Sequence, residues 1–162
     1  MIRRAKNDRD YWSGHMAFPG GREEVSDVDL LATAQRETLE ELSIELEGSC
    51  RLLGRLQDLT HPKLSVSAFV FAVSSPIEPE PNYEVASVHW VPLAAFDQAE
   101  NWKEHTVSYQ NVDRVLPIVW VGTLDIWGIS LHFIEQLRSK LKAVEESIDP
   151  LAAVSIQPGQ LL

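Results

Sequence analysis

The chain has 162 residues, a length that suits one domain with a sizeable core. Its 24 acidic residues outnumber its 14 lysines and arginines, and the formal net charge of −10 argues against a nucleic-acid backbone as the main partner. The single cysteine, Cys50, excludes an internal disulfide and a cysteine-based metal cluster, and it fits a reducing cytoplasm. No apolar run is long enough to span a membrane.

The first elements predicted along the chain are a sharp turn and a helix. The turn is marked by the stretch FPGG at residues 18–21. Ser26 or Asp27 can cap a helix that runs over residues 28–42.

Strands and one long helix are predicted for the rest of the chain. In order they are strands over 51–59 and 65–73, a proline-rich loop over 74–82, a strand over 84–93, a short helix or turn over 94–102, a β-hairpin over 115–128 and an amphipathic helix over 129–147. The apolar, β-branched segment 65–73 is expected to be central. Strands mixed with two helices indicate a layered α/β (α+β) fold. We expect one domain over residues 1–146 and a tail over 147–162 that packs back, bridges a dimer or is loose.

A helical wheel divides residues 28–42 into two faces. The face predicted to pack on a sheet consists of Val28, Leu31, Thr38, Leu39 and Leu42. The opposite face consists of Glu37, Glu40 and Glu41, with Thr33 among them.

The crowded acidic face has two interpretations. It is either an ordinary solvated surface on which Arg36 pairs with Glu40, or a binding site for a positive ion. Three carboxylates on one face suit a hard divalent cation such as Mg²⁺ or Mn²⁺. The glycine pair just upstream favours the second interpretation, because glycine lets the backbone approach a ligand closely.

The segment GGREEVSDVDLLATAQRETLEELSI, residues 20–44, resembles the signature of the Nudix hydrolases, G-x5-E-x7-R-E-U-x-E-E-x-G-U, in which U is a bulky aliphatic residue. The matching positions are Gly21, Arg36, Glu37, Glu40, Glu41 and Ile44. Asp27 stands where the first glutamate belongs, with one extra residue before the arginine. Thr38 replaces an aliphatic residue. Ser43 replaces a glycine that caps the helix in the left-handed conformation.

With the extra residue, the spacing from Gly21 to Arg36 resembles that of the coenzyme A pyrophosphatase branch of this family. That branch also has a TALRE run similar to TAQRE at 33–37. That branch also carries the upstream pattern LLTxR[SA]-x3-R-x3-G-x3-FPGG. Positions that match it are Arg4, Ala5, Arg9, Gly14 and residues 18–21, with one additional residue between Arg9 and Gly14. Because the pattern starts before Met1, the chain resembles an N-terminally shortened member. The resemblance extends through the IWG segment at 126–128 to about residue 140.

The resemblance implies an α/β/α sandwich with a mixed β-sheet between helices, and a Mg²⁺- or Mn²⁺-dependent pyrophosphatase. Its substrate would be a nucleoside diphosphate linked to a group X, either coenzyme A or a derivative, or another nucleotide such as ADP-ribose, a nucleotide sugar, a dinucleoside polyphosphate or an oxidised nucleotide. A Nudix-fold binding module without turnover is the remaining alternative. Homodimers are common in the family.

The resemblance also assigns residues to the site. The implied catalytic set is Glu37, Glu40, Glu41 and Arg36, in which Arg36 orients a carboxylate. The implied metal ligands are the three glutamates and the Gly21 carbonyl, with Glu24 as a further ligand or lining residue. The general base would be a glutamate of this set, Glu84 or Glu104. Trp120 and Trp127 either stack on the substrate base or pack in the core, and His15 either meets substrate or is structural.

Overall fold

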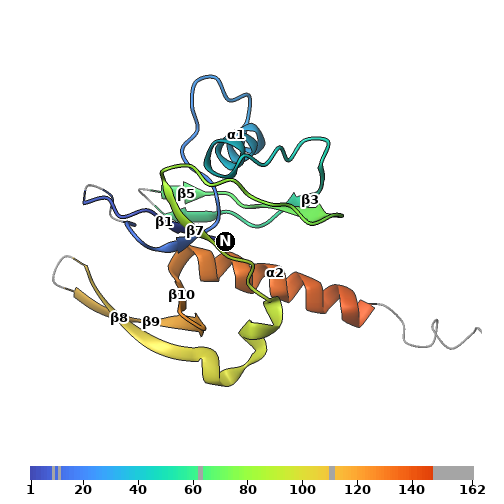
Figure 1. The fold of residues 1–162 in the computed structure, drawn as a ribbon. Helices are drawn as coiled ribbons and strands as arrows, with labels where there is room; N and C mark the ends of the chain where they lie inside the picture. The colour runs from blue at the N-terminus through green and yellow to red at the C-terminus, as the bar shows by residue number, and fades with distance from the viewer. Residues whose placement is uncertain (9, 11, 62–63, 110–111, 148–162) are drawn as a thin grey trace, which may run out of the picture.

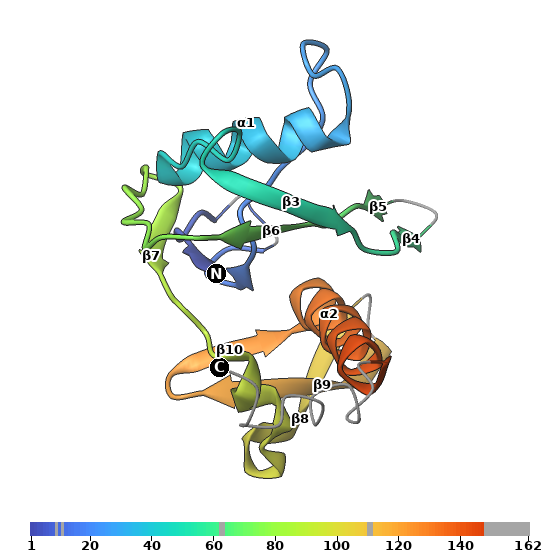
Figure 2. The same ribbon diagram turned by 90° about the vertical axis from the view of Figure 1, so that its right-hand side faces the viewer.

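A computed structural model of the chain describes residues 1–8, 10, 12–61, 64–109 and 112–147. Two helices, α1 (Leu30–Leu42) and α2 (Gly128–Ser147), lie on opposite sides of a layer of strands (Figures 1 and 2). This arrangement confirms the expected α/β sandwich, of α+β composition. The predicted tail lies, from residue 148 onward, outside the described residues. Within the ranges given, no helix combines the length and the apolar character that a membrane crossing needs.

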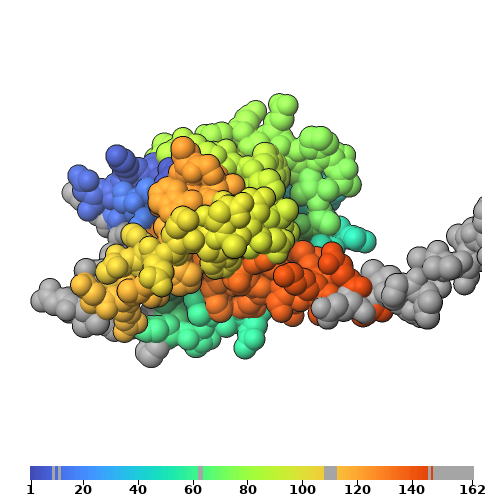
Figure 3. Space-filling model, turned by 90° about the horizontal axis from the view of Figure 1, so that it is seen from below, coloured from blue at the N-terminus to red at the C-terminus, as the bar shows by residue number. Residues whose placement is uncertain are grey.

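The other elements are short strands and two 3₁₀ helices. In chain order they are β1 (Ile2–Arg4), β2 (Met16–Ala17), β3 (Cys50–Arg55), β4 (Leu59–His61), β5 (Leu64–Val66), β6 (Phe69–Val73), β7 (Val85–Val88), η1 (Leu93–Asp97), η2 (Ala99–Asn101), β8 (Trp102–Tyr109), β9 (Val112–Val121) and β10 (Leu124–Trp127). They pair in antiparallel fashion as β2-β1-β7, β10-β9-β8, β3-β6 and β4-β5. Seen from below, β8, β9 and α2 form much of one face of the molecule (Figure 3).

Strand β1 is the centre around which the site is built. Ile2 opposes Ala17 of β2 on one side and Val88 of β7 on the other, and its side chain is fully buried. A small apolar cluster joins Ile2 to Leu42 at the end of α1 and to Val85 of β7. Burying these side chains fixes the C-terminal turn of α1 on the β1–β7 pair.

A larger cluster holds the second half of the chain together. Its buried members are Met16, Phe96, Val119, Leu124, Ile126, Leu131 and Ile134. They come from β2, η1, β9, β10 and α2, so this core joins α2 to the strands beneath it. Ser130 of α2 adds a buried hydrogen bond by donating its hydroxyl to the Met16 carbonyl at 3.1 Å.

Several predicted elements are confirmed and others are wrong. The hairpin at 115–128 is formed by β9 and β10, and the segment 94–102 holds the two 3₁₀ helices. The segment 65–73 was expected to be one central strand, but it is divided between β5 and β6. Among the described strands, β6 pairs with β3 alone, so that expectation is wrong. Helix α1 begins two residues later than expected, because Asp29 is its N-cap and accepts a hydrogen bond from the Ala32 amide at 2.8 Å.

Candidate active site

Part of the acidic face of α1 is turned inward, so the buried side of the helix differs from the one expected from the helical wheel. Glu41 is 3% exposed and Thr33 is 5% exposed, whereas Leu39 is 51% exposed. Val28, expected on the apolar face, precedes the helix and is 90% exposed. Thr38 and Leu42 are buried as predicted. The helix therefore buries the boundary between the two faces, and the Glu37 and Glu41 side chains are only 17% and 4% exposed.

The FPGG turn covers these carboxylates. The Gly20 amide donates a hydrogen bond to Glu41 Oε2 at 3.0 Å. A Cβ atom placed on Gly21 would lie only 2.1 Å from Glu37 Oε1. Glycine at position 21 is thus what allows the Glu37 carboxylate to rest against the backbone of the turn.

Arg36 is anchored by Asp27, at the position where the signature has its first glutamate. The Arg36 Nε and Nη2 groups donate to the two Asp27 carboxylate oxygens at 3.0 and 3.1 Å. Asp27 also accepts hydrogen bonds from the Thr33 hydroxyl and the Glu24 amide, both at 2.9 Å. These donors, with Arg36 foremost, hold the pKa of Asp27 well below its usual range. The Asp27 carboxylate in turn raises the pKa of Arg36.

Arg36 also contacts the acidic residues of α1. Its Nη1 group donates to Glu37 at 3.1 Å and to Glu40 at 3.2 Å. The Glu40 side chain is 54% exposed, so it lies at the rim of the site rather than inside it. Glu24 lies at 4.0 Å from the same nitrogen on an exposed loop. The predicted pair of Arg36 with Glu40 is confirmed, and it coexists with the inward orientation of the other carboxylates.

Burial disfavours the ionised form of the two inner carboxylates, Glu37 and Glu41. Loss of water raises the pKa of Glu41 to about 7, and the neighbouring charges of Glu37 and Glu84 act in the same direction. The Gly20 amide and the Arg4 guanidinium, 4.0 Å away, oppose this rise only in part. Burial also raises the pKa of Glu37, despite the adjacent Arg36.

Glu84 is placed beside this pair by the loop that precedes β7. The Glu80 and Asn82 amides donate to the Leu42 and Glu41 carbonyls at 2.9 and 3.0 Å, which caps the end of α1. The Ala5 amide donates to the Glu84 carbonyl at 2.7 Å, and so joins this loop to β1. These contacts explain why the third carboxylate lies within electrostatic reach of the first two.

Comparison with known proteins identifies the family of the chain. A family profile described as the NUDIX domain matches residues 1–112. The chain belongs to the Nudix family. It is 31% identical over 135 residues to the uncharacterized Nudix hydrolase NudL of Citrobacter koseri, an alignment that covers 80% of this chain and 68% of that protein.

Two other relatives are longer than this chain. The mitochondrial coenzyme A diphosphatase NUDT8 of Homo sapiens is 31% identical over 122 residues, which cover 72% of this chain and 51% of that protein. The uncharacterized protein C14C4.10c of Schizosaccharomyces pombe is 39% identical over 105 residues, which cover 58% of this chain and 31% of that protein. The chain thus spans about half of the human relative and about a third of the yeast one.

Nudix hydrolases generally use divalent cations, and the donors present here suit such an ion. Glu37 and Glu41 supply hard oxygen atoms, and their like charges repel each other and that of Glu84. In the described part of the chain, no three His, Cys, Asp or Glu side chains are gathered closely enough to form a ready-made metal cage. The donor chemistry therefore fits the cation, and the carboxylates would have to draw together to hold it.

The structure also places other residues of the Nudix resemblance. Glu104 is on β8, which lies at the opposite end of the molecule from α1 (Figures 1 and 2). Trp127 and His15 are brought together, with ring centroids 4.9 Å apart, and His105 packs 5.2 Å from the same indole. Trp120 is 43% exposed on β9. Arg9 of the upstream pattern lies outside the described residues.

Sequence reasoning missed the role of Asp10. This residue accepts two hydrogen bonds from Arg4, the upstream-pattern arginine that lies near Glu41. An aspartate six residues after an arginine carries no periodic signal. Only a turn-forming residue type hinted at its role.

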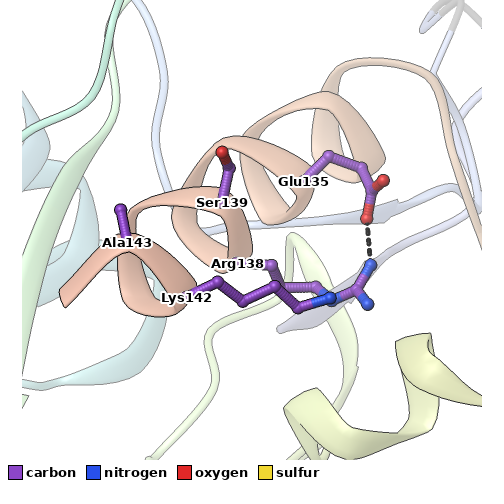
Figure 4. A pocket seen from close by; sticks show the side chains of 5 residues that line it. All are labelled: Glu135, Arg138, Ser139, Lys142 and Ala143. Carbon is purple, nitrogen blue, oxygen red and sulfur yellow. Dashed lines mark hydrogen bonds and ion pairs between the residues drawn. The ribbon is translucent and has the colours of Figure 1, made fainter. Parts of the chain in front are cut away.

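A depression on the surface of α2 is separate from the carboxylates. Its lining consists of Glu135, Arg138, Ser139, Lys142 and Ala143 (Figure 4). Within it, Arg138 donates to Glu135 and also to Asp97 of η1. The ion pair of Arg138 with Asp97 joins α2 to η1, so we assign these side chains a structural role.

The raised pKa of Glu41 predicts how stability depends on pH in the absence of metal. A carboxyl group whose pKa is higher in the folded state binds protons more readily when the protein is native. The cost in folding free energy of keeping this group ionised is therefore fully present above pH 7, and it is relieved as the pH falls towards about 4.3. We expect the free energy of unfolding of the wild type to gain about 2 to 3 kcal/mol from this group between pH 8 and pH 5. Glu41→Gln should lose that gain.

Urea titrations in EDTA at several pH values would measure both proteins. Subtracting the Glu41→Gln series from the wild-type series removes the contributions of the histidines, which titrate in the same range. Parallel pH profiles for the two proteins would contradict the raised pKa.

Proposed function

We propose that this chain is a Mg²⁺- or Mn²⁺-dependent pyrophosphatase that hydrolyses a nucleoside diphosphate linked to a group X, with coenzyme A or a derivative as the preferred substrate. The products would be a nucleoside monophosphate and the phosphate of X. We further propose that residues 1–146 form the domain responsible for this activity.

One observation carries the proposal: the carboxylates of Glu37 and Glu41 are folded inward against the Gly20–Gly21 turn. A solvated acidic surface would gain nothing from this arrangement, because burying charged groups of the same sign is unfavourable. A bound cation reverses the balance, since it replaces repulsion between carboxylates with attraction to each of them. The coenzyme A preference is supported by the TAQRE run, by the upstream pattern and by the name of the human relative.

The residues are assigned by their burial and contacts. Glu37 and Glu41 would hold the cation, with the Gly21 carbonyl and, after rotation from the rim, Glu40 as further ligands. Arg36 orients Glu37 from its anchor on Asp27. Glu84 is the preferred proton acceptor because it lies near both inner carboxylates while its backbone is fixed on both sides.

These residues would divide the reaction between them. A divalent cation bound at the site supplies neutralisation of phosphate oxygens and lowers the pKa of a bound water. Glu84 would accept the proton of the attacking water, as a new bond from the water oxygen to phosphorus forms and the bridging P–O bond of the diphosphate breaks. The FPGG turn and β1 would exclude bulk water from the inner side of the carboxylates. Arg36 would keep the Glu37 carboxylate facing the substrate throughout.

Several finer points remain predictions of the same proposal. Another nucleotide is the alternative substrate, and a Nudix-fold module that binds without turnover is the alternative function. Homodimer formation is predicted from the family. Location in the cytoplasm is predicted from the single cysteine, whereas the name of the human relative places that protein in mitochondria.

A substrate panel tests the reaction. Coenzyme A, ADP-ribose, NADH, dinucleoside polyphosphates and nucleoside triphosphates are each incubated with Mg²⁺ or Mn²⁺, and phosphomonoester release is measured. We expect coenzyme A to be cleaved fastest and EDTA to abolish cleavage. Glu41→Gln should lower kcat by at least about a hundredfold, because it removes a cation ligand.

Glu45→Gln is the matched control, since it makes the same change at an exposed position just beyond α1. It should leave kcat unchanged. Faster cleavage of another nucleotide would overturn the substrate and keep the reaction class. Binding of coenzyme A without any cleavage would favour the non-catalytic module.

Substitution of the two glycines of the turn should have different effects, on activity at Gly21 and on stability at Gly20. Gly21→Ala should lower kcat by about tenfold or more with little change in Tm, because the new Cβ displaces the Glu37 carboxylate, a flexible group. Gly20 has φ of +149°, a conformation that L side chains rarely adopt, and nothing lies within 4 Å of its Cβ position. Gly20→Ala should therefore lower stability by about 1 to 3 kcal/mol through backbone strain.

Kinetics and thermal melting of both variants separate these effects. A Gly21→Ala protein with wild-type kcat would show that the Glu37 position is unimportant for activity.

A further inference from the structure

Two successive arginines on β1 have different partners. Arg3 donates to Asp125 of β10 at 2.9 Å. Arg4 donates through Nε and Nη2 to one oxygen of Asp10, Oδ2, at 3.0 and 2.8 Å. The two side chains are equally exposed, at 28% and 27%. Of the two, Arg4 is the one directed towards α1, where its Nη1 lies 4.0 Å from Glu41 Oε1.

The turn after β1 fixes the carboxylate that holds Arg4. The Asp10 amide donates to the Asn7 carbonyl at 3.0 Å, and the Ser13 amide donates to the Asp10 carbonyl at 3.1 Å. The other carboxylate oxygen of Asp10, Oδ1, accepts from the Trp12 amide at 3.0 Å. Backbone contacts therefore aim Oδ2 at Arg4, in the manner of an aspartate that organises its own turn.

Asp10 and Glu41 compete for the same guanidinium. At 4.0 Å, Arg4 forms no hydrogen bond with Glu41, whereas both of its bonds to Asp10 are of normal length. The Glu41 side chain is 4% exposed and that of Asp10 is 19% exposed. A direct pair of Arg4 with Glu41 would be less screened by water, so it would form readily if Asp10 lost its charge.

We propose that Asp10 is a positioning residue that holds Arg4 away from Glu41, and so keeps the Glu41 carboxylate open to a divalent cation. The inference rests on the proposed function, in which Glu41 is a cation ligand. Asp10, which lies outside the signature at residues 20–44, thus keeps the acidic site available to the cation. The Asp10 carboxylate occupies the one guanidinium that faces Glu41 from β1.

The test is Mn²⁺ affinity measured by calorimetry on the full chain, without substrate. Asp10→Asn keeps an acceptor for the Trp12 amide but weakens the hold on Arg4, so Kd for Mn²⁺ should rise about fivefold. Arg4→Gln removes the competing cation, so it should bind Mn²⁺ at least as tightly as the wild type. The double variant Arg4→Gln/Asp10→Asn should match Arg4→Gln.

Asp125→Asn is the matched control, because it makes the same change to the partner of Arg3. It should leave the Kd for Mn²⁺ at the wild-type value, and thermal melting would confirm that each variant is folded. A wild-type Kd for Asp10→Asn would overturn the inference. A weakening by Asp10→Asn that persists in the Arg4→Gln background would also overturn it, because Asp10 would then act independently of Arg4.

Glu41→Gln distinguishes failure of the inference from failure of the proposed function. If Glu41→Gln binds Mn²⁺ as tightly as the wild type, the cation site itself is wrong and both proposals fail. If Glu41→Gln loses Mn²⁺ while Asp10→Asn retains it, the cation site stands and the inference alone fails.

Discussion

The burial of Glu41 against the Gly20–Gly21 turn is the constraint on which the rest of the site depends. The side chain has one backbone hydrogen bond and one arginine at 4.0 Å, with other carboxylates nearby. A buried carboxylate with so little compensation is costly unless it is protonated or meets a cation. The apolar contacts of Leu42 with Ile2 and Val85, one residue further along α1, fix the helix in the orientation that maintains this burial.

Two arginines approach the carboxylates, and each is anchored by an aspartate. Asp27 anchors Arg36 near Glu37, while Asp10 anchors Arg4 near Glu41. Both aspartates accept backbone amides from their own loops, so their positions are set locally. This arrangement provides positive charge close to the acidic site without neutralising it fully. A site for a divalent cation and an anionic substrate needs that balance.

Local pattern was enough to predict part of this structure. The periodic apolar residues of α2, the hairpin before it and the carboxylates of α1 were visible because their signals depend on near neighbours in sequence. Ser43 also behaves as expected of a helix end, since its φ of 56° takes the left-handed conformation of the glycine it replaces. The resemblance predicted which acidic residues form the site.

The features that the sequence did not predict depend on contacts between segments that are distant in sequence or that meet only when the chain folds. The wheel of residues 28–42 ranked faces by apolar content, but it could not include a glycine turn that covers acidic side chains. Ser26, Asp27 and Asp29 are all residue types that cap helices well. In the structure Asp29 is the cap, while Asp27 is bound by Arg36 from the next turns of the helix. Asp10 was missed because its contact with Arg4 depends on how the turn folds, rather than on any repeat.

Anomalous diffraction from crystals grown with Mn²⁺ tests the central claim most directly. We expect an anomalous peak within coordination distance of the Glu37 and Glu41 carboxylates, with Arg36 still bound to Asp27. A peak confined to other surfaces, or Glu41 still directed only at the Gly20 amide in the presence of saturating Mn²⁺, would contradict the account.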